Sequence, residues 1–240
     1  MGFREVMDKA SSGDPRAQCA LGLIYYTGDG TPQDLNRAFI WFNMAAEQGD
    51  PEGEFYTAYM YVHALGTNAN IDEAVRFYTD SAEKGFVRSM FNLAHMYSDG
   101  LGVKQDWSKA IDYYQRAMEG GSVPACYRLG VIYDEGYGVE KDPEKAFGYY
   151  SRCAEVGYDR ASVRIAMLYL EGRGVQKNPN AAVKHLNAAA GNGDADAMLW
   201  LGKLSLSGEG MAKSVNNAKK WLQKASVRGN EEAKKLLGTL

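Results

Sequence analysis

The first residues in the sequence that could do chemistry are a serine and a lysine three positions apart. Ser81 and Lys84 fit the Ser-x-x-Lys pattern in which penicillin-recognising enzymes use the serine as the nucleophile. No Lys-Thr-Gly accompanies them, and Ser98-Asp99 is followed by glycine where those enzymes have asparagine. We therefore expect Ser81 to be a packing residue, and burial of its side chain would exclude a nucleophile.

Glycine pairs of the form Gly-x-Gly recur along the chain and could suggest a phosphate-binding loop. Gly136 and Gly138 are one example. The pairs follow helical patterns rather than strands, and neither a lysine-serine pair nor a third glycine stands at the distance that phosphate loops require. The glycines instead predict turns that terminate helices.

Histidines and cysteines could bind a metal, but their positions do not favour one. None of His63, His95 and His185 belongs to a set of His, Cys or Asp residues at helical spacing that would close a zinc site. Three cysteines in a chain of 240 residues do not suggest a fold built on disulfides. We expect neither a metal nor a cofactor.

The segment 122–157 shows which elements must position these residues. Each half has apolar residues at spacings of three and four, which predicts two helices. These stripes are Ala125, Leu129, Ile132 and Tyr133, then Ala146, Tyr149, Tyr150 and Cys153. Gly136 and Gly138 separate the two helices, Asp142-Pro143 starts the second, and Gly157 ends it. Helices this short are marginal alone, so the hairpin needs neighbours.

The neighbours are copies of the same hairpin. Shifting the chain by 36 residues aligns it from end to end without insertion or deletion. We number six copies, at 14–49, 50–85, 86–121, 122–157, 158–193 and 194–229. A half-repeat at 3–13 and a capping helix at 230–240 complete an array that covers 1–240. A fixed period of this length predicts an all-α solenoid of stacked hairpins in a single domain.

Two columns of this alignment carry specific expectations. The second loop glycine, for example Gly138, is glycine in all six copies, which predicts a positive φ angle. Copy two is irregular because Ala64 replaces the first loop glycine and Thr67 replaces the usual valine or methionine. We expect its loop to differ in conformation. Asp14, Asp34, Asp50, Asp142 and Asn178 are predicted to start helices.

At these positions the chain resembles the Sel-1-like repeat family, a relative of the tetratricopeptide repeats. Copy four carries the matching pattern as Ala125, Leu129-Gly130, Tyr133, Gly136-x-Gly138-Val139, Asp142 and Lys145-Ala146. The resemblance covers 14–229 and both half-units. It implies a right-handed superhelix whose first helices line the concave side, used as an adaptor or scaffold in protein complexes.

A cysteine-rich branch of that family is linked to β-lactam binding and joins the two helices of a repeat by a disulfide. Cys126 stands where the first cysteine of that branch stands. Cys153 falls one residue before the matching position, which turns it by about 100° around the helix axis. We therefore expect buried thiols rather than a bridge.

Composition narrows the classes of partner. The chain is 45% hydrophobic and 24% charged with a net charge of −3, so we expect no nucleic-acid surface. No apolar run has membrane-spanning length, so we expect no membrane insertion. Met1–Ala10 lacks the apolar core of a signal peptide, which favours the cytoplasm for the chain as given. A secreted or periplasmic protein is the alternative if the chain was trimmed.

The first helices offer a candidate partner-binding surface. Their sixth and tenth positions lie away from the core stripe of the hairpin on a helical wheel and are partly aromatic in copies two to four. The candidate groove residues are Phe55, Tyr59, Phe91, His95 and Tyr127. Charged residues near the rim are Arg128, Glu135, Arg164 and Glu171, with each arginine seven residues before a glutamate on its own helix. The alternatives are packing between adjacent first helices and solvated charge.

Taken together, the sequence favours a non-catalytic scaffold that binds a protein or peptide on its concave face as a monomer. One alternative is a β-lactam-binding or hydrolase-type enzyme, which needs a base beside an accessible Ser81. The other is a structural element that self-associates through its ends.

Overall fold

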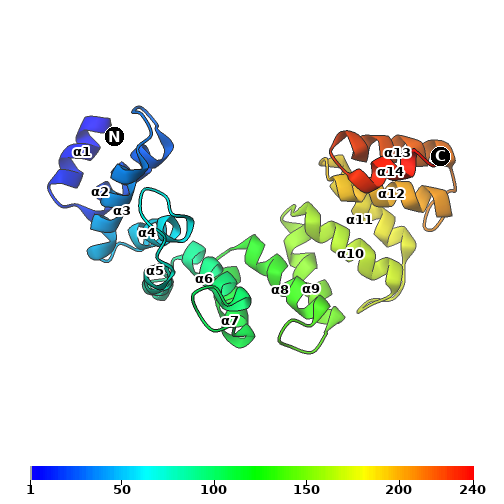
Figure 1. The fold of residues 1–240 in the computed structure, drawn as a ribbon. Coiled ribbons are helices and arrows are strands. Elements are labelled where there is room, and N and C mark those ends of the chain that lie inside the picture. Colours follow the sequence, from blue (N-terminus) through cyan, green and yellow to red (C-terminus); the bar gives the residue numbers. More distant parts are fainter. Residues whose placement is uncertain (1) are drawn as a thin grey trace. The chain divides into compact units, whose positions relative to one another are not determined.

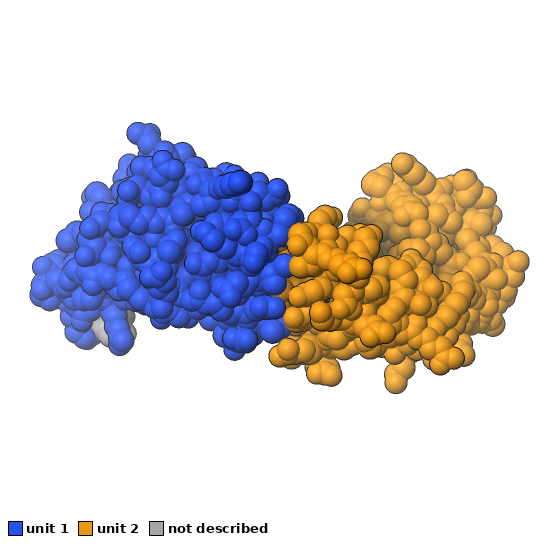
Figure 2. Space-filling view, turned by 90° about the horizontal axis from the view of Figure 1, so that it is seen from below, with its two compact units in different colours: residues 1–125 blue, residues 126–240 orange. Residues whose placement is uncertain are grey.

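The computed structural model describes residues 2–240, and these residues form fourteen helices and no strand, which confirms the all-α prediction. They fall into two compact units that divide between residues 125 and 126 and that we call unit 1 and unit 2 (Figures 1 and 2). Unit 1 contains α1 (Phe3–Ser11), α2 (Pro15–Thr27), α3 (Leu35–Glu47), α4 (Pro51–His63), α5 (Ile71–Glu83), α6 (Val87–Asp99) and α7 (Trp107–Glu119). Helix α8 (Val123–Glu135) includes the border. Unit 2 continues with α9 (Pro143–Glu155), α10 (Asp159–Glu171), α11 (Pro179–Gly191), α12 (Ala195–Ser207), α13 (Val215–Val227) and α14 (Glu231–Leu237).

Local capping chemistry sets the helix ends. The five predicted start residues each precede a helix, and each side chain accepts a hydrogen bond from the backbone N–H three residues on, as Asp142 does from Lys145 at 2.9 Å. First helices end at a residue in the left-handed conformation, for example Gly28. The hairpins predicted from the 36-residue period are therefore formed by successive helix pairs, from α2 with α3 to α12 with α13.

Each hairpin is centred on a large side chain of the second helix that lies against a small residue of the first. Tyr150 is fully buried, and a Cβ added at Gly130 would lie 2.6 Å from its ring. Gly22 faces Phe42 at the same distance, and Ala58, Ala94 and Ala166 are the buried small residues of three other copies. The alanine near the start of each second helix is also buried in all six copies: Ala38, Ala74, Ala110, Ala146, Ala182 and Ala218. Close helix approach depends on these small residues.

The second loop glycine has a positive φ angle in all six copies, including 68° at Gly138, as predicted. This column has a further role in packing. A Cβ at Gly66 would overlap the backbone carbonyl of Leu35, at the start of the second helix of the preceding copy. Gly174 and Gly210 meet Pro143 and Pro179 in the same way, whereas a Cβ at Gly30 would meet no atom within 4 Å.

This difference separates the cost of the φ angle from the cost of the overlap. We expect Gly30→Ala to lower the free energy of unfolding by about 1 kcal/mol, because only the left-handed backbone is penalised. Gly66→Ala carries the same penalty and an overlap with backbone, so it should cost a further 1–3 kcal/mol or so. Urea unfolding followed by circular dichroism measures both. Equal losses would show that the backbone of Leu35 moves aside freely.

The loop of copy two does not differ in conformation, so that expectation is wrong. Ala64 has φ 51° and ψ 41°, which is the left-handed conformation that Gly28 has at the same position of copy one. Its backbone N–H donates to the carbonyl of Met60, as Gly28 donates to Ile24. Alanine tolerates this conformation at a cost of about 1–2 kcal/mol, which the rest of the turn, including Gly66, can offset.

Ala64→Gly should therefore stabilise the protein. Glycine removes the conformational penalty of a left-handed alanine from the folded state, and this penalty is larger than the entropic cost of a more flexible unfolded chain. We therefore expect the free energy of unfolding to rise by about 0.5–1 kcal/mol. The control is Ala69→Gly, at an exposed position in the same loop where φ is not positive, which should be neutral or destabilising. A loss of stability in Ala64→Gly would contradict the assigned conformation.

A partly buried ion pair links α4 to the residue that follows α5 in copy two. Glu54 is 3% exposed and pairs with Lys84, and its Oε2 has no hydrogen-bond partner among the described residues. Burial raises the pKa of Glu54, against the lowering effect of Lys84. Copy one has Gln18 and Gln48 at the same two positions, where the amide of Gln48 donates to Gln18 at 2.7 Å. Copy one thus has a neutral hydrogen bond at the two positions where copy two has an ion pair.

The raised pKa of Glu54 predicts a pH-dependent stability. The folded state binds the proton of this group more tightly than the unfolded state. The contribution of Glu54 to the free energy of unfolding is therefore greatest at a pH below its ordinary pKa, and it is lost as the pH rises through the pKa of the folded state. Relative to wild type, Glu54→Gln should become progressively more stable as pH rises above that ordinary range. Urea midpoints across pH test this, and Glu54→Gln with Lys84→Gln, which recreates the pair of copy one, should follow the same trend.

Candidate partner-binding site

The structure excludes Ser81 as a nucleophile in the described fold. Ser81 is fully buried, its hydroxyl donates to the carbonyl of Pro51 at 2.6 Å, and it accepts from Ser89 at 2.7 Å. Lys84 pairs with Glu54 instead of acting as a base for the serine. Burial and this hydrogen-bond chain therefore give Ser81 a packing role, as predicted.

His63 and His95 line one pocket and His185 lies in unit 2, and the part of the chain that the structure describes has no group of three His, Cys, Asp or Glu side chains that could hold a metal. His185 stacks on Tyr169 with ring centroids 5.9 Å apart, and burial lowers its pKa. His63 and His95 both belong to unit 1, on α4 and α6.

The cysteines are buried thiols rather than partners in a bridge, as predicted, although the one-residue offset does not keep Cys126 and Cys153 apart. Cys126 and Cys153 lie close enough for a hydrogen bond between their thiols, which lowers the pKa of Cys126 and raises that of Cys153. Cys126 also donates to the carbonyl of Tyr149 at 3.3 Å. Both side chains reach the interior between α8 and α9, so a rotation of about 100° along one helix does not separate them.

The aromatic sixth-position residues of copies two to four pack into the hairpin, which corrects the prediction that they lie away from its core. Each contacts the large tyrosine of its own second helix. The ring pairs are Phe55 with Tyr78 at 5.9 Å, Phe91 with Tyr114 at 5.8 Å and Tyr127 with Tyr150 at 5.6 Å. Phe55 is 8% exposed and also contacts Phe86 at the start of the next copy. The helical wheel failed here because large rings reach around the helix to neighbouring elements.

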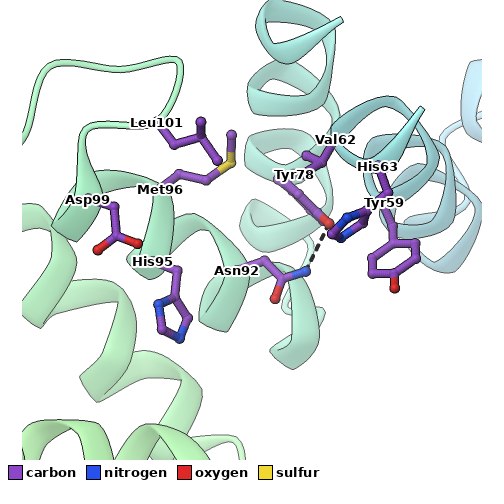
Figure 3. A pocket seen from close by; sticks show the side chains of 9 residues that line it. All are labelled: Tyr59, Val62, His63, Tyr78, Asn92, His95, Met96, Asp99 and Leu101. Carbon is purple, nitrogen blue, oxygen red and sulfur yellow. Dashed lines mark hydrogen bonds between the residues drawn. The ribbon is translucent and has the colours of Figure 1, made fainter. Parts of the chain in front are cut away.

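The tenth-position residues of copies two and three lie at an open pocket. Tyr59 and His95 are half-buried and line a cavity of about 200 Å³ in unit 1, which we call the Tyr59 pocket (Figure 3). Its lining consists of Tyr59, Val62 and His63 from α4, Tyr78 from α5, Asn92, His95, Met96 and Asp99 from α6, and Leu101 from the following loop.

The two walls of the Tyr59 pocket are held from behind by ring contacts and one hydrogen bond. On one side Tyr59 lies against His63, with ring centroids 4.3 Å apart. On the other, His95 lies edge-on to Tyr114 at 5.6 Å. Between them, the amide nitrogen of Asn92 donates to the hydroxyl of Tyr78 at 2.8 Å, as Figure 3 shows. The pocket therefore combines an aromatic wall with a fixed polar floor.

Sequence reasoning identified Tyr59 and His95 but missed most of the pocket. His63 and Asp99 stand four residues after Tyr59 and His95, one turn further along the same faces. That spacing could have predicted that His63 and Asp99 line the same pocket. It could not have predicted Asn92 and Leu101, because their position in the lining depends on how α4, α5 and α6 stack.

The predicted rim residues Arg164 and Glu171 find partners other than each other: Arg164 pairs with the preceding copy, and Glu171 pairs within its own copy. Arg164 lies 3.9 Å from Glu135 on α8, and Glu171 pairs with Arg173 at 2.5 Å. Seven residues of helix rise by about 10.5 Å, so Arg164 lies too far along α10 from Glu171 for direct contact. Arg128 is exposed and takes part in none of the ion pairs found among residues 2–240.

Asp134, next to Glu135 on α8, is only 2% exposed. It accepts from Arg173 at 2.5 Å and from the hydroxyl of Tyr150 at 3.4 Å. This pair joins copies four and five within unit 2.

Tyr127 lines a different cavity, within unit 2. That cavity measures about 440 Å³ and is lined by Tyr127, Arg160, Val163, Arg164, Met167, Asp194, Asp196 and Trp200. It carries charges of both signs. The described units thus bring Tyr59 and His95 together, hold Phe55 and Phe91 mainly in packing contacts, and place Tyr127 at a separate pocket.

The sequence model described as Sel1 repeat matches six consecutive segments of the chain, at 15–50, 51–86, 87–122, 123–158, 160–194 and 195–230. No curated protein sequence matches the chain significantly. Among residues 2–240, no helix combines the length and apolar character needed to cross a membrane.

Several solved structures resemble the fold. A protective antigen of uropathogenic Escherichia coli strains, which displays an SLR fold, matches with a TM-score of 0.93 and 30% identity over 100% of this chain and 51% of that one. This chain therefore spans about half the length of that relative. A Sel1 repeat protein from Oxalobacter formigenes matches with a TM-score of 0.81 and 29% identity over 95% of this chain and 100% of that one. An immunity protein from Pseudomonas aeruginosa, at 19% identity, a TM-score of 0.51 and coverage of 88% and 80%, shares the fold alone.

Proposed function

Because the chain belongs to the Sel1 repeat family, whose members are generally protein-interaction scaffolds, we propose that it is a non-catalytic scaffold for a protein partner. A peptide or helix of that partner docks on the first helices of unit 1, over the Tyr59 pocket. The observation that carries this proposal is the open cavity between Tyr59 and His95, at tenth positions of neighbouring copies.

The contrast between neighbouring positions supports docking at this place. Phe55, one turn before Tyr59, is almost fully buried against Tyr78 and Phe86. Tyr59 remains half-buried beside a cavity that no side chain of residues 2–240 fills. Amphipathic rings with one open side are typical anchors for partners, because their burial releases water from a large apolar area.

A library of random peptides displayed on phage tests the proposal without knowledge of the natural partner. Peptides selected on the wild-type chain should bind it, and Tyr59→Ala should weaken them about thirtyfold, which corresponds to the roughly 2 kcal/mol of a typical aromatic anchor. Fluorescence anisotropy measures the dissociation constants.

The matched control is Tyr61→Ala, on the same helix, because Tyr61 stacks on Phe77 and does not line the Tyr59 pocket. It should lower the melting temperature while the folded fraction binds normally. If Tyr59→Ala behaves like this control, Tyr59 has only a packing role. If the selected peptides bind both variants as tightly as wild type, they dock elsewhere.

A further inference from the structure

The ionisable lining of the Tyr59 pocket lacks a fixed positive charge. Apart from its two tyrosines, it consists of His63, His95 and Asp99, with no lysine or arginine. Asp99 is exposed and accepts a hydrogen bond from the hydroxyl of Ser98 at 3.0 Å. None of the ion pairs in the described part of the chain includes Asp99. This carboxylate is therefore available to a cation from outside.

A second oxygen acceptor lies in the same lining. The amide nitrogen of Asn92 donates to Tyr78, so its side-chain carbonyl oxygen is the atom that can accept a hydrogen bond from a ligand. Figure 3 shows the two atoms pointing in different directions. An ammonium or guanidinium group carries several N–H donors and no acceptor, which matches a carboxylate with an amide oxygen. A ligand that carries a carboxylate would be repelled by the negative charge of Asp99.

In copy six, a lysine of the chain itself lies between an aromatic ring and a carboxylate. Lys203 stands at the tenth position of copy six, the column that holds Tyr59 and His95 in copies two and three. Its ammonium lies 4.4 Å from the ring centroid of Trp200 and 2.6 Å from the carboxylate of Glu232. Aromatic ring, carboxylate and lysine are thus complete in copy six. The Tyr59 pocket has the rings and the carboxylate without the cation.

The size of the pocket fits one long side chain. Its volume of about 200 Å³ is below the range of about 300–1,000 Å³ that is typical of small-molecule sites. The apolar lining residues Val62, Met96 and Leu101 can cover a hydrocarbon stem while the charged head reaches the oxygen acceptors. We propose that the Tyr59 pocket receives a lysine or arginine side chain of the docked partner segment, which rests on the proposed function.

A pair of tripeptides tests this inference on the full chain. The first probe is acetyl-Gly-Lys-Gly-amide, and the second replaces lysine by norleucine, which keeps the stem and removes the charge. The lysine probe should bind in the millimolar range and shift the amide NMR signals of residues around Asn92 and Asp99. The dissociation constant of the norleucine probe should be about fivefold higher than that of the lysine probe, because one exposed cation–π or ionic contact contributes roughly that factor to the affinity.

Charge variants give the specificity of the effect. Asp99→Asn should reduce lysine binding to the level of norleucine, whereas Glu119→Gln, an exposed carboxylate outside the pocket, should leave it unchanged. An arginine probe should behave like lysine. The inference is overturned if norleucine binds as well as lysine, if a glutamate tripeptide binds better, or if no probe shifts the signals of the pocket at about 20 mM.

The two proposals can fail separately. If phage-selected peptides depend on Tyr59 but the lysine probe does not bind, the docking face is retained and the basic anchor is refuted. If the lysine probe binds at Asp99 but no selected peptide depends on Tyr59, the pocket holds cations and the docking face is refuted.

Discussion

The contact between a large side chain on the second helix and a small residue on the first is the constraint on which each hairpin depends. At Gly130 and Gly22, even a Cβ atom would meet the ring of Tyr150 or Phe42. The ring fixes the distance between the helices because it fills the space that the missing side chain leaves. Both helices must then keep this pair in register, which is consistent with the constant length of 13 residues from α2 to α13 and with a period free of insertions.

Features that depend on neighbouring residues in the sequence could be predicted from it. The capping by Asp142 and the positive φ of Gly138 follow from local chemistry, and both agree with the structure. Ala64 shows the limit of this reasoning. Its type argues against the left-handed conformation, but the turn imposes that conformation regardless of the residue. Helix ends were therefore predictable from local chemistry, whereas the backbone conformation at Ala64 was not.

Features that depend on the stacking of helices could not be predicted in the same way. The pairing of Arg164 with Glu135 and the adjacency of Cys126 and Cys153 are decided by distances between helices, which no spacing along one helix reveals. The candidate site divides along the same line. The column analysis identified Tyr59, but Asn92 enters the pocket only through the position of α6 beside α4 and α5.

The joint between copies four and five limits how this repeat array can grow during evolution. Asp134 and Arg173 come from consecutive copies, and the corresponding residues of copies two and three are Val62 and Leu101. Tandem duplication of copy four would place a second Tyr137, instead of Arg173, beside the first Asp134 and leave that buried charge uncompensated. Lengthening at the apolar joint between copies two and three carries no such penalty. The order of the copies is therefore restricted at one joint even though their length is uniform.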